Sequence, residues 1–165
     1  MSPEEIVSLD ILSILQVLGW AASPVFELRV AIPWAMLKLH FPWYYAFLVA
    51  IIGNLLPVPF ILLFLDTGSR LLSRVRFFDR VLRWLFERTR RRGRIIERYE
   101  RIGLVLFVAI PLPVTGAWTG SLAAVLFGLK FRHALVSILI GVLIAGVIVT
   151  CVTHFGLHVF GLFKD

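Results

Sequence analysis

The sequence contains a single cysteine, Cys151, which lies in an apolar run. One cysteine cannot form an intramolecular disulfide, so a fold held together by disulfides is excluded. The chain also begins without the cationic leader of a signal peptide. The run Ser2-Pro3-Glu4-Glu5 is instead typical of a helix start, and we expect the N-terminus to be mature.

Motifs of known chemistry are also missing. The sequence has no nucleophile–base pair, phosphate-binding loop or cofactor fingerprint, and its four histidines lack the spacing of metal ligands. We therefore expect no enzyme, no cofactor and no metal site.

Charge is scarce and unevenly placed. Only 16% of the 165 residues are charged, 59% are hydrophobic and the mean hydropathy is +0.91. A single domain of this length cannot hide so much apolar surface in its core, so we predict an all-α, multi-pass protein of the cell (inner) membrane. Twelve arginines lie between Thr67 and Gly103. The positive-inside rule places this segment, 67–103, in the cytoplasm, and we expect it to bind no nucleic acid.

Hydropathy predicts two membrane spans, at 43–65 and 131–153. The first carries Asn54 and two prolines in "GNLLPVP", which predicts a kink. A helix at 3–22 can either span the membrane or lie in its interface. Between the spans, the segment 66–101 has the pattern of an amphipathic helix on anionic headgroups, and a dedicated partner or nucleic-acid site is the alternative. Its cationic face carries Arg76, Arg80 and Arg83.

Two further apolar segments, 24–42 and 103–129, are interrupted by helix breakers. Broken backbone at membrane depth is tolerated only where protein or a wet cavity covers it, so we predict two re-entrant, broken-helix hairpins. The residues at the breaks are Pro24, Pro33, Pro111, Pro113, Gly116 and Gly120. A shift of 88 residues sets Gly53 on Gly141 and overlays the two halves, which predicts an inverted repeat of hairpin and span.

The first hairpin contains two charges, Glu27 and Arg29, in the apolar run "PVFELRVAIPWAM". One ionised side chain at mid-bilayer costs roughly 2.5–3.5 kcal/mol. Positions i and i+2 do not face each other on a regular helix, so either the backbone breaks here or each charge has a partner elsewhere. Arginine binds phosphate or carboxylate through its planar fork, and a desolvated carboxyl exchanges protons near neutral pH. The alternative is a salt bridge that only locks the hairpin, or a pair of charges that lies shallowly at the membrane interface.

Four other residues are candidates for contacts with substrate. In the second hairpin these are Thr115, Trp118 and Thr119, beside a helix N-terminus that offers free amides to an anion. The alternative is that these small residues only permit close helix packing. Asn54 is the fourth, although an asparagine in a span often bonds to a neighbouring helix.

Three motifs, "FELRVAIPWAM", "IGNLLPVP" and "IPLPVTGAWTGSLAAVLFGL", resemble the prokaryotic small multi-drug export protein family. The resemblance implies efflux. The layout is also similar to the DedA/VTT group, whose two facing re-entrant hairpins are implicated in moving lipids such as undecaprenyl phosphate between leaflets. That group's acidic residue in the first hairpin corresponds to Glu27, whereas its arginine in the second hairpin has no counterpart in "PLPVTGAW".

These observations lead to three hypotheses. The first is a DedA-like transporter that moves an anionic lipid head group, coupled to protons through Glu27 and contacting the head group through Arg29. The second is a proton-coupled exporter of amphipathic drugs, for which Glu27 is essential and Arg29 dispensable. The third is a non-transporting membrane scaffold. We expect the protein to be a homodimer, because a chain with so few spans needs a second copy to cover its hairpins.

Overall fold

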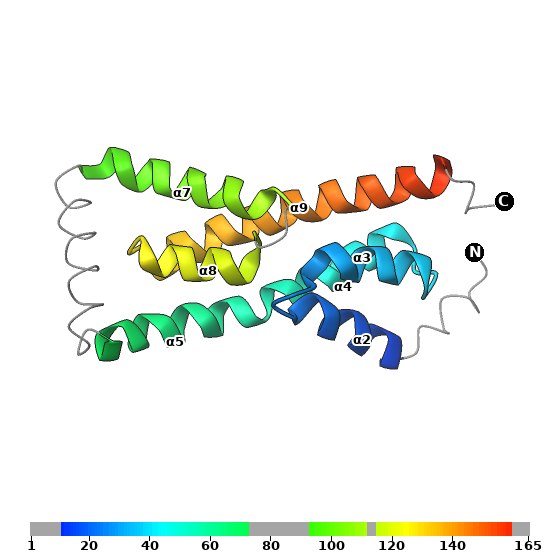
Figure 1. Ribbon diagram of the computed structural model, residues 1–165, viewed down its shortest axis with the longest axis horizontal. Coiled ribbons are helices and arrows are strands. Elements are labelled where there is room, and N and C mark those ends of the chain that lie inside the picture. The colour runs from blue at the N-terminus through cyan, green and yellow to red at the C-terminus, as the bar shows by residue number, and fades with distance from the viewer. Residues whose placement is uncertain (1–10, 73–92, 112–114, 160–165) are drawn as a thin grey trace. The chain divides into compact units, whose positions relative to one another are not determined.

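The computed structural model describes residues 11–72, 93–111 and 115–159 (Figure 1). Within these ranges every regular element is a helix, as the sequence predicts. The helices are α2 (Ile11–Ala22), α3 (Glu27–Leu37), α4 (Trp43–Leu55), α5 (Pro57–Leu72), α7 (Gly93–Ala109), α8 (Ala117–Leu126) and α9 (Phe131–Val159). Four of the predicted residues lie outside the described residues: Arg76, Arg80 and Arg83 of the predicted cationic face, and Pro113.

Two helical stretches are long and apolar enough to cross a membrane. They are Trp43–Phe64, with 22 residues and a mean hydropathy of 2.4, and Phe131–Gly156, with 26 residues and 2.9. At 1.5 Å per residue they measure about 33 and 39 Å, against a hydrocarbon core of about 30 Å. They coincide with the spans that hydropathy predicts at 43–65 and 131–153.

The first stretch is interrupted, because α4 ends at Leu55 and α5 begins at Pro57. The Leu56 amide still donates to the Ile52 carbonyl at 3.0 Å. Pro57 and Pro59 have no amide hydrogen, so they cannot donate helical hydrogen bonds to the carbonyls of Gly53 and Leu55. The predicted kink therefore lies at Leu56.

The helix α9 leaves many large apolar side chains exposed. Its buried residues recur at helical spacing and include Ala134, Ile138, Val142, Ala145 and Val149. Its other faces expose residues such as Ile140 at 43%, Val147 at 52% and Val152 at 67%. An apolar surface of this extent is typical of a helix in contact with lipid.

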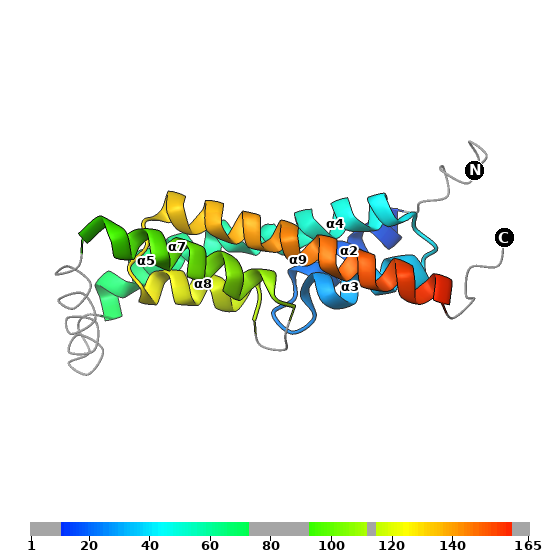
Figure 2. The same ribbon diagram turned by 90° about the horizontal axis from the view of Figure 1, so that it is seen from above.

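The chain divides into two compact units. Unit 1 comprises residues 1–56 and 143–165, and so contains α2, α3, α4 and the end of α9. A four-residue turn, 23–26, joins α2 to α3, and residues 38–42 return the chain into α4, so α3 and α4 run antiparallel (Figures 1 and 2). The buried core of these helices is rich in alanine and includes Val17, Ala21, Ala31, Ile32, Ala35, Ala46 and Ala50. Small residues of this kind allow helix backbones to approach closely.

Two glycines in unit 1 permit close helix contacts. A Cβ atom added to Gly53 on α4 would lie 2.8 Å from the Ala21 Cβ and 2.9 Å from the Leu18 carbonyl oxygen of α2. One added to Gly146 on α9 would lie 2.8 Å from side-chain atoms of Phe47 and Ile51 on α4. At both sites the neighbouring helix occupies the space of a side chain.

Unit 2 comprises residues 57–142, which include α5, α7, α8 and the beginning of α9. Here α7 and α8 form a second helical hairpin, side by side in both views (Figures 1 and 2). A Cβ atom on Gly141 of α9 would lie 2.7 Å from the Val108 Cβ and 3.0 Å from the Val105 carbonyl oxygen of α7. The unit therefore packs its long helix closely on the first helix of its hairpin.

The observed helix boundaries correct the predicted break at Pro33. That proline lies inside α3, which is continuous from Glu27 to Leu37. Proline removes one amide donor, and apolar helices tolerate it where neighbouring groups satisfy the freed carbonyl. The turn that reverses the chain is instead 23–26, which contains Pro24, so α2 is the first arm of the hairpin rather than a separate helix.

The break in the second hairpin involves fewer of the predicted residues than expected. Helix α7 ends at Ala109 and α8 starts at Ala117, so Pro111 and Gly116 lie between the helices. Gly120 lies inside α8 and is buried against Val108 and Ile138. It serves packing between helices rather than a break.

Candidate functional site

Glu27 stands at a break in the backbone. Its φ angle is 51°, a left-handed conformation that is uncommon for a residue with a Cβ. The preceding residue, Phe26, is right-handed helical, and the Glu27 amide donates to the Ser23 carbonyl at 3.2 Å. A strained residue of this kind persists only where its surroundings impose it, and such residues cluster at functional sites.

This break explains how two residues at i and i+2 meet. The Arg29 Nη2 atom lies 3.9 Å from the Glu27 Oε2 atom. On a regular helix these side chains would point apart. The left-handed turn at Glu27 redirects its carboxylate, so of the two sequence-based explanations the structure supports the broken backbone.

The two charges differ in their exposure to the surroundings. The Glu27 side chain is 8% exposed and the Arg29 side chain 22%. At 3.9 Å the pair exceeds the 2.7–2.9 Å of a charge-assisted hydrogen bond, so the attraction is Coulombic and loose. A carboxylate in this position is largely removed from solvent, while its guanidinium partner remains within reach of a ligand.

Asn54 is buried at the same end of unit 1. It follows Gly53, which contacts the last turn of α2 immediately before the turn that leads to Glu27. Asn54 is 1% exposed, and among the described residues neither its Nδ2 nor its Oδ1 atom has a hydrogen-bond partner. A buried polar group without a partner costs about 1–3 kcal/mol, so this carboxamide is suited to a ligand or a water molecule.

The candidates in the second hairpin are engaged locally. The Thr115 hydroxyl donates to the Ile110 carbonyl at 2.7 Å and the Thr119 hydroxyl to the Gly116 carbonyl at 3.4 Å. Both bonds brace the turn between α7 and α8, and Trp118 in the first turn of α8 is half-buried. Gly116 is the N-cap residue of α8 and has no side chain to cap the helix.

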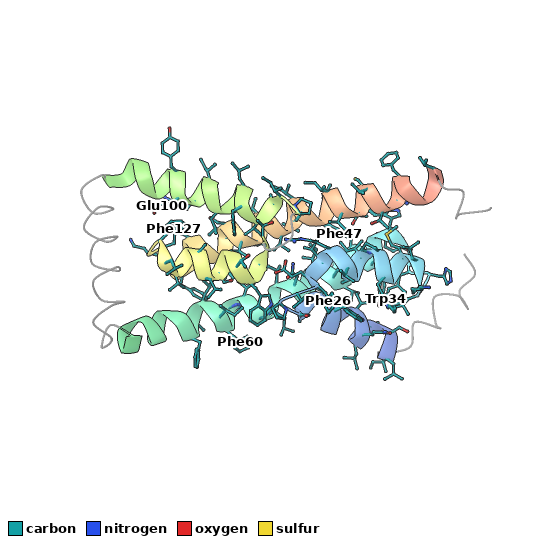
Figure 3. All side chains as sticks on the ribbon, in the orientation of Figure 1. Phe26, Trp34, Phe47, Phe60, Glu100 and Phe127 are labelled. Carbon is teal, nitrogen blue, oxygen red and sulfur yellow. The ribbon has the colours of Figure 1, made fainter. Side chains whose placement is uncertain are left out.

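An aromatic cluster beside Glu27 is absent from the sequence-based predictions. The Trp20 ring centroid lies 4.6 Å from that of Phe26 and 5.8 Å from that of Trp34. Figure 3 labels Phe26 and Trp34 on this hairpin. The signal was the recurrence of aromatic residues on both sides of Pro24, which becomes meaningful once α2 and α3 are recognised as one hairpin.

No three His, Cys, Asp or Glu side chains gather as metal ligands in the parts of the chain that the structure describes. No curated protein and no solved structure matches the chain. A family model does match, over residues 27–148, which include Glu27, Arg29, Asn54 and the whole of the second hairpin. The match covers most of the chain and begins at the strained glutamate itself. The protein therefore belongs to the family described as "Putative small multi-drug export protein".

Proposed function

We propose that this protein is a membrane transporter that exports small amphipathic molecules in exchange for protons, with Glu27 as the group that carries the proton. The observation that carries the proposal is the Glu27 carboxylate, 8% exposed and held by a left-handed backbone at the tip of a helical hairpin. Removal from water favours the neutral form of a carboxyl, and a nearby cation favours the charged form. A group balanced in this way can exchange a proton for a substrate.

The hairpins suit a re-entrant arrangement. Helices α2 and α3 have 12 and 11 residues and α8 has 10, so they extend about 18, 16 and 15 Å. Each of these three covers only about half of a hydrocarbon core of about 30 Å, whereas α7, with 17 residues, extends about 26 Å. A hairpin that enters from one side would therefore place its tip near mid-membrane, the depth at which transporters of this kind bind their substrates.

An inverted repeat is supported by the positions of equivalent elements. A shift of 88 residues carries the first residue of α4, Trp43, onto the first residue of α9, Phe131. It also carries Gly53 onto Gly141, and each of these glycines contacts two residues three apart on the first helix of its own hairpin. Each unit thus contains a helical hairpin and one part of each long stretch, so the two units are built from equivalent elements.

A second candidate function is movement of an anionic lipid head group, in the manner of the DedA-like proteins. The observation that favours it is Arg29, whose guanidinium is more exposed than the carboxylate beside it. A guanidinium fork binds phosphate oxygens bidentately. In this case the arginine would bind the substrate and Glu27 would release the arginine on protonation.

The two candidates predict opposite roles for Arg29. The purified protein is reconstituted into liposomes, and uptake of a cationic dye and leaflet exchange of a fluorescent polyprenyl phosphate are measured with and without a pH gradient. For drug export, Glu27→Gln abolishes dye uptake and Arg29→Gln preserves it. For lipid movement, Arg29→Gln abolishes leaflet exchange.

Matched controls come from the same structure. Lys38→Gln removes a cation at the opposite, exposed end of α3, and Glu100→Gln removes a half-buried carboxylate from α7 (Figure 3). Both controls should leave transport within about twofold of the wild type. If Glu27→Gln and Arg29→Gln are also silent for both cargoes, the transporter proposal is wrong and the scaffold hypothesis gains support.

A further inference from the structure

The aromatic cluster of Trp20, Phe26 and Trp34 gathers three rings from one hairpin. Trp20 lies in α2, Phe26 in the turn and Trp34 in α3. The Trp20 and Phe26 rings meet edge to face, with an interplanar angle of 72°, and Trp20 and Trp34 are tilted by 35°. Phe26 is 39% exposed, and both tryptophans are half-buried. The cluster is thus open on one side rather than sealed in the core.

The same turn carries the Glu27 carboxylate. The Ser23 amide donates to the Trp20 carbonyl at 3.3 Å, and the Glu27 amide donates to the Ser23 carbonyl at 3.2 Å. These two bonds fold the chain from Trp20 to Glu27 into a compact turn. The backbone positions that carry the Trp20 ring, the Phe26 ring and the Glu27 carboxylate are therefore held within one turn.

This combination is complementary to a cation. Aromatic faces carry partial negative charge and attract cations, tryptophan most strongly. A desolvated carboxylate adds a full negative charge. An inorganic cation would need several oxygen ligands, whereas no group of three His, Cys, Asp or Glu side chains occurs among the described residues. An apolar organic cation instead needs one counter-charge and a wall of rings.

We propose that the aromatic cluster and Glu27 form a binding site for monovalent, lipophilic organic cations. The inference rests on the proposed transport function and names its substrate class. Arg29, at 3.9 Å from Glu27, acts as a tethered cation that the substrate displaces. The carboxylate is then paired before and after the exchange, so the substrate does not have to bind against an unpaired buried charge.

The test uses two hydrophobic ions of matched size and shape, tetraphenylphosphonium and tetraphenylborate. Binding of each to the purified protein is measured by isothermal titration calorimetry. The cation is expected to bind and the anion is not. Trp20→Leu should weaken cation binding by about two- to thirtyfold, because leucine keeps apolar contact and loses the ring. Trp20→Phe should retain most of the affinity.

Further variants separate a binding role from a structural one. Phe26→Leu changes an exposed ring and should weaken cation binding without lowering the melting temperature. Glu27→Gln should abolish cation binding, and Arg29→Gln should strengthen it. Trp43→Leu is the matched control. Trp43 is 53% exposed and begins α4, at the end of the α3–α4 pair that lies away from Glu27, so its replacement should leave the cation affinity unchanged.

The outcomes distinguish this inference from the transport proposal. Tetraphenylborate binding that requires Arg29 would overturn the cation site while leaving lipid transport in place. Equal affinities for Trp20→Leu, Trp20→Phe and the wild type would also overturn it, even if Glu27→Gln still abolished transport. A loss of transport in Glu27→Gln together with the expected ring dependence would support both.

Discussion

Replacement of Asn54 by leucine should stabilise the substrate-free protein and impair its transport. Asn54 is 1% exposed, and neither atom of its carboxamide has a hydrogen-bond partner in the described part of the chain. Each unsatisfied polar group costs about 1–3 kcal/mol, and an apolar residue of similar size removes that cost. Because leucine must also fit without overpacking, we expect a net gain of about 1–3 kcal/mol. For a chain of this length that gain raises the melting temperature by roughly 2 °C or more.

The measurement is thermal unfolding of the protein in nanodiscs, with and without substrate. Ser121→Ala is the matched control, since Ser121 is equally buried but its hydroxyl donates to the Ala117 carbonyl at 2.7 Å. Removal of a satisfied hydroxyl should leave stability unchanged or lower it by about 1 kcal/mol. If Asn54→Leu instead lowers the melting temperature, Asn54 bonds within the protein and the assignment of a ligand contact is refuted.

Three further changes test the packing and the turns. Gly53→Ala should destabilise the protein by about 1–3 kcal/mol in the same unfolding assay, because the added Cβ atom would overlap α2. Gly19→Ala is the control: a Cβ atom added there has no neighbour within 4 Å, so this change should be neutral or stabilising. Pro33→Ala should preserve transport and slightly raise the melting temperature, since α3 already continues through this position and regains an amide donor; a loss of transport would show that the proline is required. Thr115→Val should cost about 1 kcal/mol through loss of the 2.7 Å bond to Ile110, and a larger loss of transport than of stability would indicate a direct role in substrate binding.

The sequence predicts most of the elements because hydropathy and helix breakers act locally. Long apolar runs locate the stretches Trp43–Phe64 and Phe131–Gly156. The cluster of proline and glycine after Ala109 locates the turn between α7 and α8, and the loss of two amide donors locates the kink at Leu56. Each of these features depends on a residue and its immediate neighbours, so a pattern in the chain is sufficient.

The same reasoning fails at Pro33. A proline predicts a break from its missing donor, but in a helix packed on both α2 and α4 the surrounding contacts outweigh the loss of one hydrogen bond. The reversal of the chain falls at 23–26 instead, which shifts the hairpin towards the N-terminus. Because of this shift, Trp20 belongs to the first arm of the hairpin, and Glu27 is the first residue of the second arm.

Composition and spacing alone determined that this chain is helical and apolar with two long stretches, and that Glu27 and Arg29 lie in an apolar run. Only the tertiary structure decided that these two side chains meet. It also decided that Asn54 is buried without a hydrogen-bond partner in the described part of the chain, and that three aromatic rings gather on the hairpin that carries Glu27. The physical reason is that these facts depend on a backbone angle at Glu27 and on contacts between α2, α3 and α4. Neither is encoded in the periodicity of any single segment.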